Sequence, residues 1–278
     1  GIEVVDLTPL SNVNLTLLRL CNDTACVAGA ADQKATSVPL AGNAPNYMYW
    51  VDHGRQPKGQ TTAVIETVDG GLTFTVTLTE VQRAAAIALS GTPGGDGHAI
   101  YLNALHGAMF DIGANKLPGY QGPMIVNETA DMIAPSVTAA KLNYSSGFLT
   151  LTATEVLDAT PGSLLNLSNI HLVEVTGARD VVLTGATVIE VDDLQVTIKL
   201  TEQQRVLAIA ISGTKGGDAA AVKLDVNKGG VRDYAGNLNV AGLSTNILVA
   251  ETADVLPPKV LSAVIDLGTG LLIITVNE

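Results

Sequence analysis

Two stretches of this chain are near copies of each other. Residues 78–96 read LTEVQRAAAIALSGTPGGD and residues 200–218 read LTEQQRVLAIAISGTKGGD, with fourteen of nineteen positions identical at an offset of 122. The tetrapeptide Glu-Thr-Ala-Asp at 128–131 recurs at 251–254, and a proline follows each copy. Self-similarity at a fixed spacing is typical of repeated structural units. The sequence therefore predicts two homologous domains that meet at extended, proline-containing linkers.

The first domain carries an insertion. Residues 3–20 align without a gap with residues 155–172 at an offset of 152, which exceeds the later offset of 122 by 30 residues. The insertion holds the only tryptophan and both cysteines, so we interpret it as an elaborated loop on a repeated scaffold. The predicted boundaries are 1–134 for domain 1, with the insertion at about 21–75, then 135–256 for domain 2 and 257–278 for the start of a third repeat.

The hydrophobic pattern within one repeat predicts short strands and one short helix. Apolar and polar residues alternate at 148–152, as in a half-buried strand. Thr201 stands three residues before Gln204, which predicts a capping box that opens a helix at 202–211. Strands are predicted at 137–143, 148–154, 170–175, 187–191, 194–200, 220–226 and 245–250.

The strand count and the composition together favour one fold class. Hydrophobic residues make up 47% of the chain and aromatic residues only 4%, so aliphatic side chains must build the core. Seven short strands with little helix in about 120 residues are typical of an immunoglobulin-like sandwich. We expect an all-β fold of tandem immunoglobulin-like β-sandwiches, with a short helix in each repeat and a C-terminal orphan strand segment.

Two short motifs carry a resemblance to a known family. The segment from Pro135 through 148–158 is similar to the opening of bacterial Ig-like repeats, which read P-x-V and then G-x-L-T-[IV]-T-F-S-E-x-V-D. Residues 231–238 (VRDYAGNL) resemble their D-x-A-G-N-x-L motif, and residues 111–117 hold a degenerate version. Such repeats occur in S-layers, adhesins and other cell-surface polymers. The resemblance implies a structural role and no catalysis.

The third repeat is incomplete, and so is the first. Residues 271–278 (LLIITVNE) align with 148–155 (FLTLTATE), whereas Gly1 aligns with Ala153, so domain 1 lacks the first strand or two of the repeat. Bare sheet edges and isolated strands are both unfavourable in water. Residues 259–276 of one chain would resolve both problems by completing domain 1 of the next chain, as in β-strand donation.

Strand donation predicts a head-to-tail homopolymer that grows into a filament or surface layer. Leu272, Ile274 and Val276 align with core positions, and the whole predicted polymerisation strand comprises Leu271, Leu272, Ile273, Ile274 and Val276. Two alternatives stay open. The chain is one window of a longer covalent array of repeats, or its ends are arbitrary.

Several features point outside the cell. The chain begins with Gly1 rather than methionine and has no leader, so we expect a processed product. Cys21 and Cys26 have the spacing of a small loop-closing disulfide, although two unpaired thiols are the alternative. Five Asn-x-Ser/Thr sequons are candidate sites for covalent N-glycans: Asn14, Asn22, Asn127, Asn143 and Asn166.

The motifs of enzymes and of cationic binding proteins are missing. The sequence has no H-E-x-x-H, no G-x-S-x-G and no phosphate loop, so we expect no enzyme. A net charge of −12 argues against nucleic acid and anionic membranes as partners, and no apolar stretch is long enough for membrane insertion. We expect no cofactor. Asp111 and Asp233 are calcium candidates, and solvated loop carboxylates are the alternative.

The insertion offers a second function. Aromatic residues and arginine are typical binding anchors, which makes it a possible ligand loop of an adhesin or glycan-binding protein. The alternative is that the tryptophan fills the sandwich or contacts a neighbouring subunit. The residues concerned are Tyr47, Tyr49, Trp50, His53 and Arg55.

Overall fold

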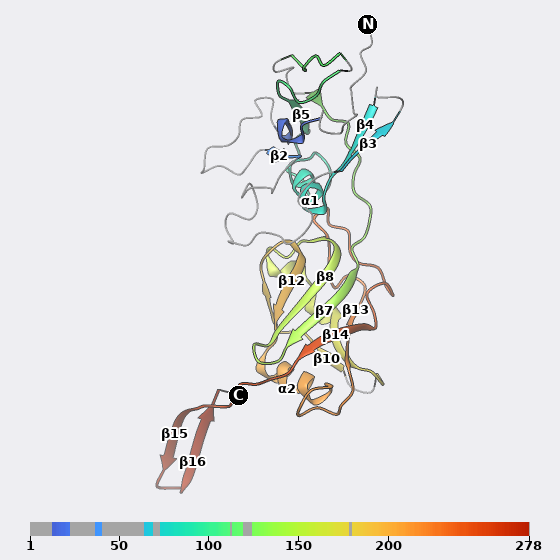
Figure 1. The fold of residues 1–278 in the computed structure, drawn as a ribbon. Helices are drawn as coiled ribbons and strands as arrows, with labels where there is room; N and C mark the ends of the chain where they lie inside the picture. The colour runs from blue at the N-terminus through green and yellow to red at the C-terminus, as the bar shows by residue number, and fades with distance from the viewer. Residues whose placement is uncertain are drawn as a thin grey trace.

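The chain forms two β-rich units followed by a separate β-hairpin (Figure 1). The computed structural model describes residues 13–22, 37–40, 64–68, 73–111, 113–118, 124–177 and 180–277. Over these residues strand is the main regular structure, arranged in several sheets, and there are two short α-helices. The predicted all-β class is confirmed. Neither helix in the described ranges is long and apolar enough to cross a membrane.

The second unit is built on one curled sheet of eight strands. Their order is β10-β9-β13-β14-β7-β8-β12-β11, and every pair is antiparallel except β14 with β7. The strands are β7 (Val137–Asn143), β8 (Phe148–Leu157), β9 (Ile170–Glu174), β10 (Asp180–Val182), β11 (Thr187–Ile189), β12 (Asp193–Lys199), β13 (Val222–Val226) and β14 (Ile247–Thr252).

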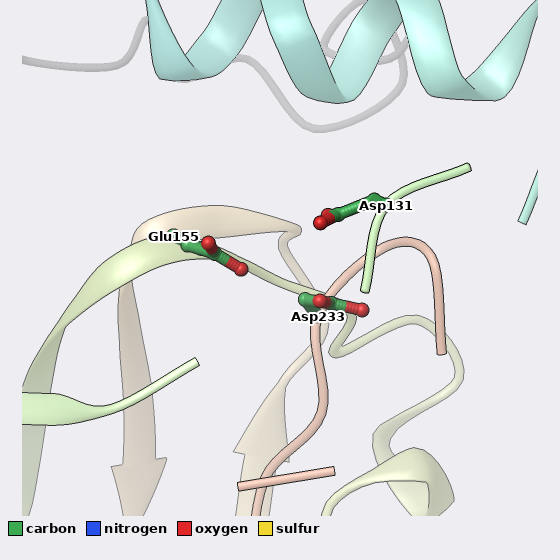
Figure 2. Close-up of side chains that lie close together, drawn as sticks. All are labelled: Asp131, Glu155 and Asp233. Carbon is green, nitrogen blue, oxygen red and sulfur yellow. The ribbon is translucent and has the colours of Figure 1, made fainter. Parts of the chain in front are cut away.

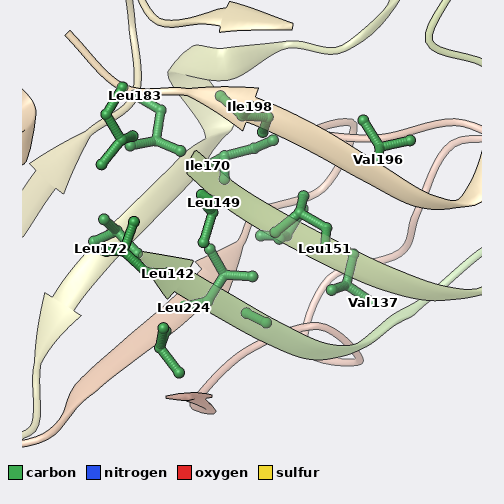
Figure 3. Close-up of a cluster of buried hydrophobic side chains, with 14 of the residues drawn as sticks. Val137, Leu142, Leu149, Leu151, Ile170, Leu172, Leu183, Val196, Ile198 and Leu224 are labelled. Carbon is green, nitrogen blue, oxygen red and sulfur yellow. The ribbon is translucent and has the colours of Figure 1, made fainter. Parts of the chain in front are cut away.

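Strand β14 joins the two halves of this sheet. Its first residues, Ile247 and Leu248, pair with β13, whereas Val249 to Thr252 pair in parallel with β7. The sheet curls around one apolar cluster to which both halves contribute (Figure 3). Leu149 and Leu151 of β8 are completely buried there. The β7–β8 hairpin therefore supplies a central part of this core.

Each unit has one short helix with the predicted cap. Helix α1 (Glu80–Ala88) and helix α2 (Glu202–Ala210) both begin with a complete capping box, formed by Thr79 with Gln82 and by Thr201 with Gln204. Gly217, after α2, is also required by packing, because a Cβ there would lie 2.1 Å from the carbonyl oxygen of Ser212. The strongest repeat in the sequence is thus a capped helix followed by a tight turn.

The first unit repeats part of this plan. Strands β1, β4, β5 and β6 correspond by alignment to β9, β12, β13 and β14. They form a sheet of order β2-β1-β5-β6 and a separate hairpin β3-β4. The elements are η2 (Leu15–Leu17), β1 (Leu18–Cys21), β2 (Ser37–Pro39), β3 (Val64–Val68), β4 (Thr73–Thr77), β5 (Tyr101–Ala104) and β6 (Met124–Ile125).

The chain continues past the second unit into an isolated hairpin. Strands β15 (Val260–Asp266) and β16 (Leu271–Val276) pair only with each other among the described residues, and every residue in them is exposed. Figure 1 shows this hairpin extending from the second unit at the end opposite the first unit. The orphan segment is therefore a two-stranded hairpin.

Candidate functional site

The isolated hairpin reproduces β7–β8 position by position. Cross-strand pairs in β15–β16, such as Ala263 with Ile274 and Ile265 with Leu272, match pairs in β7–β8 at an offset of 123. Both hairpins have an irregularity in register after their first pair, which is Val260 with Val276 in β15–β16. The same register, the same irregularity and the same spacing identify the hairpin as the opening of a further repeat.

The two copies differ sharply in burial. Leu149 and Leu151 are 0% exposed, whereas their counterparts Leu272 and Ile274 are 56% and 55% exposed. The directly paired residues of an antiparallel hairpin share a face, so Leu272 and Ile274 lie on the same face as their β15 partners. The hairpin thus presents one continuous apolar face. The equivalent face of β7–β8 is buried in the core of the second unit.

Two strands of the first unit pair on one side only among the described residues. In the second unit, β12 lies between β11 and β8, and β14 lies between β13 and β7. In the described part of the first unit, their counterparts β4 and β6 pair on one side only, with β3 and β5. The described residues of the first unit include no counterpart of β7 or β8. Two sheet edges are therefore left for a hairpin of that shape.

The core of the first unit is also left open. Leu20, Val76 and Leu102 are only partly buried. Their counterparts in the second unit are Leu172, Ile198 and Leu224, which are all completely buried. The apolar side chains of the first unit are therefore already in place but are not covered by the described residues.

A charged cluster joins the two units. Arg83, at the start of α1, donates to both carboxylate oxygens of Glu80, at 2.7 and 2.8 Å, and to Asp131 in the linker. Glu80 in turn accepts a 2.8 Å hydrogen bond from the backbone N–H of Val156 in β8. Asn237 donates to the backbone carbonyl of Asp131. Helix α1 and the linker are thus hydrogen-bonded to the end of the second unit that faces the first unit, which is called its top below.

The far end of the second unit carries the same cluster. Arg205 donates to both oxygens of Glu202 and to Asp254, in the arrangement that Arg83 has with Glu80 and Asp131. The Glu202 side chain is 48% exposed, whereas that of Glu80, which contacts the next unit, is 20% exposed. The second unit therefore carries a copy of the surface by which the first unit contacts it. This copy lies at the end from which the hairpin emerges, and the described residues leave it exposed.

The surface of the second unit that contacts the first unit also has a counterpart, on the first unit. Asp233 accepts hydrogen bonds from the backbone and side-chain nitrogens of Asn237 at 2.7 and 2.8 Å. Asp111 accepts the same two bonds from Asn115, both at 2.7 Å. Asp233 is 1% exposed beneath the first unit, whereas Asp111 is only partly buried. The top of the first unit has the same turn as the top of the second.

Three carboxylates meet at the joint between the units. Figure 2 shows Asp131 from the linker, Glu155 from β8 and Asp233 from the loop after β13 converging below α1. One oxygen of each lies within 4.8 Å of the others. The pKa of Glu155 is raised to about 7, mainly by burial and further by Asp131, although Arg83 opposes the rise. Of the two predicted calcium candidates, only Asp233 belongs to this group.

Cys21 is the one predicted disulfide residue that the structure describes. It is disulfide-bonded and completely buried at the end of β1. Cys26, the other cysteine of the chain, lies outside the described residues. The residues proposed as a ligand loop also lie outside them: Tyr47, Tyr49, Trp50, His53 and Arg55.

The sequons have structural roles that the sequence did not reveal. Asn14 and Asn166 each begin a 3-10 helix, and each side-chain oxygen accepts bonds from the backbone and hydroxyl of the Thr16 or Ser168 two residues on. Capping thus accounts for this repeated Asn-Leu-Ser/Thr motif without a glycan. Asn127 and Asn143 are exposed, and Asn22 donates to Asp96.

Comparison of the chain with protein-family models, with curated proteins and with solved structures gave no significant match.

Proposed function

We propose that this chain is an extracellular structural protein that polymerises head to tail by donating its β15–β16 hairpin to the first unit of the next copy. The observation that carries the proposal is the residue-by-residue match of this exposed hairpin to β7–β8, together with the absence of those strands from the described part of the first unit. The role is structural, and no catalytic step is assigned to it.

The second unit serves as the template for the docked arrangement. β16 lies antiparallel beside β4, as β8 lies beside β12, and β15 lies parallel beside β6, as β7 lies beside β14. With the hairpin docked, both units are immunoglobulin-like sandwiches. In the second unit, β7, β8, β12 and β11 correspond to strands A, B, E and D, and β9, β13 and β14 correspond to C, F and G.

Burial of the apolar face drives the association. Burying one aliphatic side chain fully contributes roughly 1.5–3 kcal/mol. The large aliphatic residues of the docking face are about half exposed in the free hairpin, so their burial contributes on the order of 4–8 kcal/mol before ordering costs. They are Val260, Ile265, Leu272, Ile274 and Val276. New backbone hydrogen bonds along β4 and β6 add to this.

A contact of this kind generates an open chain of copies. The hairpin and the first unit lie at opposite ends of the molecule, so donor and acceptor belong to different copies (Figure 1). Such a head-to-tail contact propagates into a filament unless the rotation between copies closes a ring. The charged cluster around Arg205 then meets the top of the next first unit, as Arg83 meets the second unit. Every joint along the filament is built alike.

An extracellular or cell-surface place fits this role. A buried disulfide at Cys21 is typical of oxidising compartments. Exposed sequon asparagines such as Asn127 and Asn143 are accessible to N-glycosylation, which makes a glycoprotein filament or S-layer-like array the proposed assembly.

Disulfide cross-linking tests the docked register. Thr150 and Thr197 lie opposite each other on β8 and β12, with hydroxyls 3.4 Å apart, and the repeat places Ile273 and Thr75 at the same positions. The double variant Thr75→Cys, Ile273→Cys is expected to form a ladder of multiples of the chain mass on a non-reducing gel.

A control pair places the second cysteine one strand further away. Val264 pairs with Ile273 on the hairpin, so the docked register puts it roughly 10 Å from Thr75, beyond the reach of a disulfide. The variant Thr75→Cys, Val264→Cys should therefore stay uncross-linked. Equal cross-linking of the two variants, or none with Ile273→Cys, would contradict the docked arrangement.

A further inference from the structure

The joint between the two units concentrates negative charge in a buried place. Asp233 is 1% exposed, Glu155 is 7% exposed and the Asp131 side chain is 8% exposed. Among the described residues, Arg83 is the cation that acts on Glu155, but two of its nitrogens donate to Glu80. The positive charge of one guanidinium, already paired with Glu80, thus compensates only part of the negative charge of the three carboxylates. Carboxylates buried so close together repel one another.

One oxygen in this cluster has no hydrogen-bond donor. The Glu155 carboxylate oxygen that forms a 3.4 Å ion pair with Arg83 is buried and accepts no hydrogen bond from the residues that the structure describes. Both oxygens of Asp233, in contrast, accept from Asn237, and those of Asp131 accept from Arg83 and Ile133. A buried acceptor without a hydrogen-bond donor is costly, so a second cation at this oxygen would stabilise it.

We propose that the Asp131, Glu155 and Asp233 carboxylates bind a calcium ion at the joint between the two units. Calcium prefers carboxylate and carbonyl oxygens at about 2.3–2.6 Å and tolerates irregular geometry, and water completes its shell. Ligand oxygens around one such ion lie within about 4.8 Å of one another, as these do.

The ion would stiffen the joint. Asp131 belongs to the linker that leaves the first unit, whereas Glu155 and Asp233 belong to the second unit. A shared cation therefore fixes the direction in which the linker enters the second unit. It also screens the carboxylates that Arg83 alone leaves unbalanced.

The same site would recur between copies, a consequence that rests on the proposed function. Asp254 and Asp111 are the repeat counterparts of Asp131 and Asp233, and Glu3 and Glu278 both align with Glu155. A filament would then bind two calcium ions per chain, and dispersed chains would bind one. The site within the chain requires no contact between copies, so it is tested on dispersed chains.

The test is a calcium titration of the full chain after removal of metal by a chelator. The variant Ile274→Asp keeps the chains dispersed, and it serves as the background for all measurements. Calorimetry is expected to give one calcium per chain with a dissociation constant of about 10⁻⁶ to 10⁻³ M. At calcium about a hundredfold above that constant, Tm should rise by about 5 to 10 °C.

Two further variants identify the ligands. Glu155→Gln keeps the shape of the side chain and removes its charge, so it should abolish the calcium heat and the rise in Tm. Without calcium its Tm should equal or exceed that of the parent, since repulsion is relieved, which separates lost binding from misfolding. Asp218→Asn changes a loop carboxylate outside the cluster and should leave the titration unchanged. Absence of calcium binding in the parent, or full binding in Glu155→Gln, would overturn the proposal.

Discussion

The substitution Ile274→Ala examines the energetics of the joint between copies. Ile274 is 55% exposed in the free hairpin, and its counterpart Leu151 is completely buried in the second unit. Truncating a buried Leu or Ile to Ala costs about 2–5 kcal/mol. Since the free chain does not bury Ile274, nearly all of this cost falls on the docked state. At about 1.4 kcal/mol per factor of ten, the joint should weaken roughly 30-fold to several thousand-fold.

Sedimentation of polymer over a range of chain concentrations measures this change as a rise in the critical concentration. The control Ile273→Thr alters the opposite face of β16 and installs the residue type of its counterpart Thr150, so it should shift the critical concentration less than about threefold. Unchanged polymerisation of Ile274→Ala, or equal losses in both variants, would refute the docking of this face into a core. Circular dichroism should show the two units intact in both.

Two further substitutions test the repeated features within the second unit. Arg205→Met removes a side chain that is 8% exposed and pairs with Asp254, so the free energy of unfolding should fall by about 2–4 kcal/mol in chemical denaturation; a loss below about 0.5 kcal/mol would contradict its packing role. Asn166→Ala should lose about 1 kcal/mol with the cap, whereas Asn166→Asp keeps the accepting oxygen and should lose little. Equal losses in the two Asn166 variants would refute the capping role.

Local features of this fold were predictable from the sequence, because their causes lie within a few residues. The capping box of Thr201 and Gln204 needs only a spacing of three, and the alternation at 148–152 needs only neighbouring residues. Strand β10 (Asp180–Val182) was missed, because three residues carry too little pattern to stand out from a loop. The 3-10 helices were hidden for the same reason.

The candidate sites were also predicted where their cause is local in the sequence, and missed where it is not. The match of 271–278 to 148–155 predicted the strand at 271–276, and the structure shows it paired with β15 in a hairpin of defined register. Donation of this segment stays a prediction. The cluster of Asp131, Glu155 and Asp233 was only partly predicted, since the three residues are far apart in sequence and meet only when one unit stands on the other. Asp111 was named from the same motif, but among the described residues it joins no such cluster.

Comparison of the two repeats in the sequence could have revealed the residue pair that lies at the contact between units. Arg83 and Asp131 are preserved in the second repeat as Arg205 and Asp254, even though the second pair has no following unit to contact within the described residues. Preservation of both partners at both ends is explained if each end meets a unit, one in the same chain and one in the next copy.

Electron microscopy of the purified 278-residue chain, together with the mass of the denatured chain from native material, tests the central claim most directly. The account predicts filaments in which one chain contributes two units per repeat, and a denatured chain near 28.6 kDa plus any glycans. Dispersed single molecules at high chain concentration would contradict strand donation. Native filaments that denature only into a very much larger chain would show instead that the joints are covalent.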